Sequence, residues 1–174
     1  MRTPRHLFVA SFLALGLSVA VPAQAQVSSE QAQSHWYAGR HELAVALLRA
    51  ELDKQPQQPK LRFMLAWMLQ ERGLWADAEA LLKQLIEDYP DHAEALNNLA
   101  VVLAQRGDLD GALLSLQRAV VLQPSNTQAQ ENLGDLLLRL AQRAYANAAK
   151  GNASRTLPVK ADQLNGLLRT LSAL

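Results

Sequence analysis

Cysteine is absent from the 174-residue sequence, and aromatic residues make up only 5% of it. Without cysteine, disulfide bonds, thiolate metal sites and cysteine nucleophiles are excluded. Neither sign of charge dominates, because 17 basic residues face 16 acidic ones and leave a net charge of +1. This balance attracts no polyanion, so we expect no nucleic-acid partner. Hydrophobic residues, at 49%, are abundant enough for apolar packing to stabilise one ordinary domain.

The longest apolar run lies near the N-terminus. Residues 7–21 read LFVASFLALGLSVAV and follow a short segment that contains Arg2 and Arg5 but no acid. This run is short for a bilayer span, and the AQA sequence at 23–25 has the small-x-small pattern of a signal peptidase site. The sequence predicts a cleaved signal peptide over residues 1–25 and a periplasmic or secreted protein without stable membrane insertion. An uncleaved N-terminal anchor is the alternative.

After this segment, the same residue types return every 34 positions. Glycine, alanine and proline repeat in the sets Gly39, Gly73 and Gly107; Ala44, Ala78, Ala112 and Ala146; and Pro56, Pro90, Pro124 and Pro158. Glycine allows a tight turn, alanine lets two helices approach closely, and proline ends a helix. The spacing therefore predicts a repeated hairpin of two helices.

The 34-residue unit resembles the tetratricopeptide repeat (TPR). In the unit over 93–126, AEALNNLAVVLAQRGDLDGALLSLQRAVVLQPSN, the TPR core positions hold Leu96, Leu99, Ala100, Leu103, Ala112, Leu116, Ala119 and Pro124. Units near 25–58 and 59–92 keep this register, although the first is weaker and leucine replaces the family's aromatic residues. The resemblance implies an all-α fold over 26–157, a short right-handed solenoid of three to four hairpins. We expect burial of Leu65, Leu69, Leu99, Leu103, Ala78, Ala112 and Leu116.

The fourth unit, over 127–157, is degenerate. Ala141 stands where the other units have their turn glycine, so we expect one long helix from about residue 128 to residue 150, or a loose hairpin. Leucines recur at helical spacing over 158–174, which predicts a C-terminal amphipathic helix that caps the array. We expect it to pack near Leu136, Leu140 and Tyr145. Docking of the same leucines on a membrane or a partner is the alternative.

The resemblance also implies that the first helix of each hairpin lines a concave groove. At about 100° per residue, positions 2, 5, 6, 9, 12 and 13 of each unit face away from the core leucines. The predicted partner-binding groove draws on these positions and consists of Phe63, Met64, Trp67, Glu71, Asn98, Val101, Gln105, Asn132 and Asp135.

Two features of this groove indicate a ligand. Phe63, Met64 and Trp67 form an apolar patch typical of contact surfaces, unless neighbouring helices cover it. Asn98 and Asn132 occupy the position at which many peptide-binding TPR proteins hold a peptide backbone, although ordinary surface residues are an equal alternative. The carboxylate clamp of chaperone-tail binders is absent, because Phe63 and Trp67 stand where it needs lysine and asparagine. An extended peptide with hydrophobic or basic side chains therefore fits better than an acidic C-terminus.

Catalytic residues are not indicated. His35, His41 and His92 have neither the spacing of a metal-binding helix nor a serine and an aspartate in triad order. Carboxylates such as Asp91 and Asp108 fall at turns, where helix capping explains them. No glycine-rich phosphate loop is present. The sequence predicts a protein that is not an enzyme and has no metal and no cofactor.

The resulting hypothesis is a TPR scaffold that binds a peptide or protein partner in the bacterial cell envelope. The segment ENLGDLLLRLAQRAYANA, from residue 131 to residue 148, also resembles the last repeat of small exported TPR proteins that accompany cell-wall transpeptidases. Two alternatives stay open: a self-assembling structural module, and an accessory factor of the peptidoglycan machinery.

Overall fold

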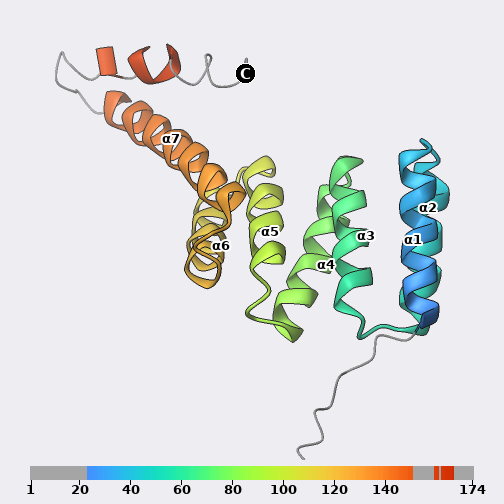
Figure 1. Cartoon of the computed structure of the whole chain (residues 1–174). Helices are drawn as coiled ribbons and strands as arrows, with labels where there is room; N and C mark the ends of the chain where they lie inside the picture. The colour runs from blue at the N-terminus through green and yellow to red at the C-terminus, as the bar shows by residue number, and fades with distance from the viewer. Residues whose placement is uncertain (1–22, 151–158, 161, 167–174) are drawn as a thin grey trace, which may run out of the picture.

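The computed structural model describes residues 23–150, 159–160 and 162–166, and regular structure in this part of the chain is helical throughout. The labelled helices are α1 (Ala23–Tyr37), α2 (His41–Lys54), α3 (Pro59–Glu71), α4 (Trp75–Asp88), α5 (Ala93–Gln105), α6 (Leu109–Leu122) and α7 (Thr127–Lys150). Figure 1 shows them side by side along the molecule, from α1 at the right to α7 at the left. The all-α prediction is confirmed.

The helices form three hairpins, α1–α2, α3–α4 and α5–α6, followed by the single helix α7. Each helix packs on the next one in the chain, and α5 also contacts both α3 and α7. The first helices therefore form one continuous layer, behind which α2, α4 and α6 form a second. Because neighbouring first helices touch one another directly, their layer lies on the inner side of the curved array.

The turns between paired helices follow the predicted register. Gly39, Gly73 and Gly107 have φ angles of 74°, 72° and 89°, a region that costs a residue with a Cβ about 1–2 kcal/mol. After each turn, one alanine (Ala44, Ala78 or Ala112) is fully buried, with 0% exposure. The closing prolines Pro56, Pro90 and Pro124 each follow a second helix by two residues. The three glycines and three alanines thus allow each hairpin to close tightly.

The core runs continuously through the hairpins. All seven residues predicted to be buried are buried in the structure: Leu65, Leu69, Leu99, Leu103, Ala78, Ala112 and Leu116. The first helices also bury positions that the leucine pattern does not mark, including Leu61 and Met68 on α3 and Ala95 and Val102 on α5. These side chains are covered because a first helix packs against its own hairpin and against the preceding one.

Helix α7 continues through the place where the other units turn. Its 24 residues decide between the long helix and the loose hairpin that the sequence left open for the fourth unit, in favour of the long helix. Ala146 occupies the same position of the 34-residue unit as the buried alanines, but it is exposed. Leu137, which has the register of Leu69 and Leu103, is 49% exposed, compared with 1% and 7% for these two residues. Among the described residues, then, α7 has no second helix to cover its outer face.

Several predictions concern residues outside this part of the chain. Residues 1–22 of the predicted signal peptide, and most of the predicted cap over 158–174, lie outside the described residues. Of the cap, residues 159–160 and 162–166 are helical. Gln142 Nε2 of α7 donates a hydrogen bond to Asn165 Oδ1 over 2.6 Å, which brings this segment to the second half of α7.

Candidate functional site

A hollow of about 230 Å³ opens between α5 and α7. Buried apolar side chains form its floor, namely Ala100, Leu116 and Leu136, and more exposed residues form its rim, namely Val101, Ala104, Gln105, Asn132, Asp135 and Arg139. The rim contains four of the nine residues predicted to line the groove. It draws them from two repeats because α5 and α7 lie next to each other in the inner layer.

A chain of side-chain amides crosses the same helices. Gln128 Nε2 donates to Asn132 Oδ1 over 3.2 Å, Asn132 Nδ2 donates to Asn97 Oδ1 over 2.9 Å, and Asn97 Nδ2 donates to Asn98 Oδ1 over 3.3 Å. Asn97 is buried, at 8% exposure, so its amide is satisfied inside the protein. The Asn98 amide group donates no hydrogen bond within the described residues, so its N–H groups are available to a ligand.

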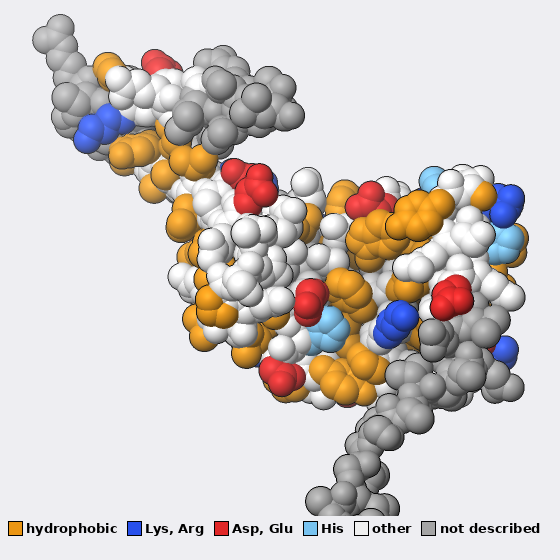
Figure 2. All heavy atoms as spheres, in the orientation of Figure 1, with side chains coloured by type: hydrophobic (Ala, Val, Ile, Leu, Met, Phe, Trp, Pro, Cys, Tyr) orange, Lys and Arg blue, Asp and Glu red, His pale blue; other side chains and the backbone are white. Residues whose placement is uncertain are grey.

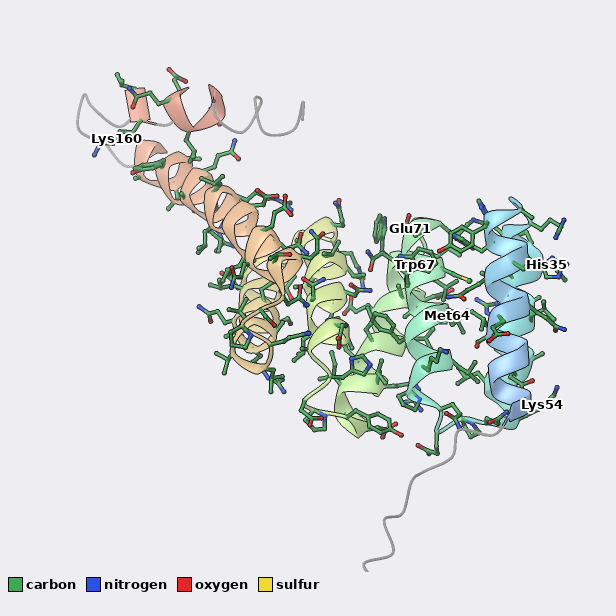
Figure 3. All side chains as sticks on the ribbon, in the orientation of Figure 1. His35, Lys54, Met64, Trp67, Glu71 and Lys160 are labelled. Atoms are coloured by element: carbon green, nitrogen blue, oxygen red, sulfur yellow. The ribbon has the colours of Figure 1, made fainter. Side chains whose placement is uncertain are left out.

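The aromatic end of the predicted groove, on α3, is partly covered. The rings of Trp67 and Trp36 have centroids 5.4 Å apart, and Phe63 stacks on His92 at 5.3 Å. Figure 3 labels Met64, Trp67 and Glu71 along α3. Met64 is only 7% exposed and belongs to the core, which corrects its assignment to the groove. Neighbouring helices thus cover Met64 fully, while Phe63 and Trp67 remain half-buried.

Acidic side chains predominate in the exposed positions of the inner layer. Glu71, Glu131 and Asp135 are exposed and make no hydrogen bond or ion pair within the described residues. Among the described side chains of the inner-layer helices, the exposed cations are Lys60, Arg139 and Arg143. Arg139 Nη2 donates to the carbonyl oxygen of Ala104 over 3.0 Å, and Arg143 pairs with Asp110 of α6. Figure 2 shows red acidic side chains spread over the face, next to orange apolar surface. The groove therefore has a negative character.

Ionic contacts elsewhere lie both within repeats and between them. The Glu79 carboxylate of α4 binds Lys83 and also Arg106, which follows α5. These hydrogen bonds, the one from Lys83 above all, lower the pKa of Glu79, while partial burial opposes them. Buried Arg62 binds Asp88 over 2.5 Å and the carbonyl oxygen of Pro56 over 2.5 Å. These charged groups have their partners within the protein, so they stabilise the packing of the solenoid.

The histidines and turn carboxylates have structural partners. His92 Nδ1 accepts a hydrogen bond from the Ala95 amide at the start of α5, and Asp108 caps α6 by accepting from the Gly111 amide. His41 lies on the Trp36 ring, with centroids 4.2 Å apart. In the described part of the chain, no group of three or more metal-binding side chains occurs. The helices found there also lack the combination of length and apolar character that crossing a bilayer requires.

The sequence pattern did not place the floor residues Leu116 and Leu136 in the groove, whereas Arg139 stands at position 13 of its unit, on the predicted groove side. Leu116 was expected only as a core residue between helices, although it also floors the hollow. Asn97 also stands at a groove-facing position, the fifth of its unit, but the structure buries its amide. The geometry of the hollow itself depends on the distance between two repeats, which no local pattern encodes.

The family model described as tetratricopeptide repeat matches residues 29–79 and 63–127. These matches together cover more than half of the chain, which therefore belongs to the tetratricopeptide repeat family. TPR units are in general protein-interaction modules. No curated protein matches the chain.

Solved TPR structures share the fold. The first TPR domain of Spaghetti (RPAP3), bound to the HSP90 peptide SRMEEVD, is 20% identical and has a TM-score of 0.65, covering 70% of this chain and 96% of that one. The second TPR domain of human RPAP3, in complex with the HSP70 peptide SGPTIEEVD, is 18% identical with a TM-score of 0.61, covering 67% and 98%. YrrB, a TPR protein with an unusual peptide-binding site, is 21% identical with a TM-score of 0.57, covering 62% and 55%.

Proposed function

We propose that this protein is a non-enzymatic scaffold that binds an extended peptide or protein partner in the groove of its inner layer. The hollow between α5 and α7 carries this proposal, because exposed polar groups surround an apolar floor there. Such a site can hold one side chain of a ligand in the hollow while nearby amides, including that of Asn98, pair with its backbone. The peptides bound to the RPAP3 domains support it, because they are short peptide ligands of TPR domains.

Site-specific photo-crosslinking in living cells tests this function. A photoreactive amino acid at Gln105, on the rim of the hollow, should yield a covalent adduct with a protein partner. The same amino acid at Glu87, an exposed position on α4, is the matched control and should yield none. Adducts of the same proteins from both positions, or none from Gln105, would contradict the proposal.

The location proposed for this function is the bacterial cell envelope, as a periplasmic or secreted protein. The N-terminal pattern over residues 1–25 supports it. Mass spectrometry of the protein purified from its native host should find Gln26 as the first residue. Recovery of intact Met1 in the membrane fraction would instead indicate an uncleaved anchor.

Self-assembly is the second candidate function. Exposed apolar side chains on α6 and α7 favour it, since Leu114, Val121 and Leu137 are 65%, 77% and 49% exposed. If these residues join copies of the chain, Leu137→Glu should reduce the mass measured by analytical ultracentrifugation. A monomer at all concentrations, with or without the substitution, would reject this candidate.

An accessory role in the peptidoglycan machinery is the finer version of the envelope proposal. Only the resemblance of residues 131–148 to the last repeat of transpeptidase-associated TPR proteins supports it. Co-sedimentation with purified peptidoglycan, in the absence of other proteins, would show a direct glycan contact. A photo-crosslink from Gln105 to a cell-wall enzyme would instead support an adaptor role.

A further inference from the structure

The hollow between α5 and α7 has an apolar floor and one unpaired charge at its rim. Its floor consists of side chains from α5, α6 and α7, of which Leu116 and Leu136 are at most 3% exposed. Asp135 stands at the rim, exposed, and makes no hydrogen bond or ion pair within the described residues. A ligand group suited to this site therefore combines an apolar stem with a positively charged end.

Arg139, the other charged residue of the rim, already has a partner. Its guanidinium donates to the carbonyl oxygen of Ala104, the penultimate residue of α5. Carbonyl groups at the end of a helix lack partners within the helix and attract cations. Arg139 thus binds the C-terminal end of α5, and the negative end of that helix partly offsets the positive charge of Arg139. The Asp135 carboxylate has no such partner.

The surroundings of the hollow strengthen the preference for a cation. Glu131 lies one turn before Asp135 on α7, and Glu71 lies on α3 in the same inner layer; both are exposed and unpaired within the described residues. Acidic peptides such as the SRMEEVD ligand of RPAP3 are negatively charged, whereas such a groove attracts positive charge.

We propose that the hollow receives one lysine or arginine side chain of an extended peptide. The methylene stem of that side chain lies on the apolar floor, and its charged end pairs with Asp135. The volume of about 230 Å³ is far above the ~15 Å³ that admits a single water molecule, so a long side chain has room. This inference rests on the proposed peptide-binding function and specifies its ligand class.

A peptide array tests the inference directly. The whole chain is applied to immobilised random nine-residue peptides of known sequence, and binding is compared with their content of lysine, arginine, aspartate and glutamate. We expect the bound peptides to be enriched in lysine or arginine and depleted of acidic residues, with SRMEEVD as an unbound reference. Raising the ionic strength should weaken binding, because exposed charge pairs are screened by salt.

Two pairs of variants locate the effect in the hollow. Asp135→Asn should weaken binding of the selected cationic peptides about three- to tenfold. Glu87→Gln, which removes an equal charge from the exposed face of α4, should leave their affinity unchanged. Ala104→Leu fills the hollow and should abolish binding, whereas Ala80→Leu, at an exposed position of α4, should not. Circular dichroism of each variant checks that the helices are intact.

The possible results separate this inference from the function on which it rests. Peptides bound without a preference for cations, or a preference for acidic peptides, would overturn the inference and leave peptide binding in place. A cation preference that survives Asp135→Asn would overturn the assignment to this hollow. Binding to no peptide at all would overturn both the inference and the proposed function.

Discussion

Four alanines occupy the same position in the 34-residue unit, and their surroundings divide the molecule into two regions. Ala44, Ala78 and Ala112 are fully buried inside hairpins, whereas Ala146 is exposed on α7. The difference begins five residues earlier, where the first three units have a glycine with positive φ and the fourth has Ala141. The alanine at this position is thus buried only where the chain forms a hairpin.

The largest expected effect compares equivalent leucines of the two regions. Leu103 is 7% exposed on α5 and Leu137 is 49% exposed on α7. Leu103→Ala should reduce the free energy of unfolding by about 2–5 kcal/mol, because it leaves a cavity in the core. Leu137→Ala should reduce it by less than about 0.5 kcal/mol. Urea unfolding followed by circular dichroism measures both, and equal losses would show that α7 has a covered outer face.

The next largest loss of stability is expected from adding volume to the packed core. Ala112→Leu adds volume at a site with 0% exposure, between the helices of the third hairpin. It should destabilise the protein by about 1–3 kcal/mol, whereas Ala146→Leu on exposed α7 should change the stability little. Thermal unfolding of both variants decides the comparison. A strong loss from Ala146→Leu would indicate that the fourth unit packs as tightly as the third.

Turn residues give a smaller difference. Gly107→Ala should cost about 1–2 kcal/mol, since its φ is 89° while its Cβ would meet no atom within 4 Å. In the opposite direction, Ala141→Gly weakens a continuous helix by about 1 kcal/mol without creating a hairpin by itself. Denaturation measures both losses. An unchanged stability of Gly107→Ala would refute the tight turn.

The smallest effect concerns the junction between the regions. Arg143 of α7 donates two hydrogen bonds to Asp110 of α6, over 3.0 and 2.6 Å, and they lower the pKa of that exposed carboxyl. A lowered pKa means that the pair adds stability above the ordinary pKa of aspartate and loses this contribution as the pH falls through the lowered value. Asp110→Asn should therefore reduce stability slightly at pH 7, and this loss should shrink as the pH falls through the lowered pKa. A loss that stays the same as the pH falls would disprove this origin.

The C-terminal cap remains a prediction that the same comparison can sharpen. The hydrogen bond between Gln142 and Asn165 is the described contact that supports it. Truncation after Arg155 should lower the melting temperature and cause aggregation if the cap covers α7. If the truncated chain melts like the full chain but loses partner binding, the segment is a docking helix instead.

Local patterns in the sequence were sufficient for the hairpins. A turn glycine, a small residue where helices cross and a closing proline act over a few residues, so their 34-residue spacing predicted the helices and the leucines and alanines buried between them. The missing glycine at position 141 limited the fourth unit to a long helix or a loose hairpin, and the structure decided for the long helix α7.

Only the tertiary structure decided which groove positions are open to a ligand. Met64 is buried, and Trp67 is half-covered by Trp36 of another hairpin, whereas Val101 and Asp135 come together at one hollow. Position on a helix determines which way a side chain points, but its exposure depends on what the neighbouring repeat places in front of it. That neighbour is about 34 residues away, and its approach is set by packing across the whole inner layer.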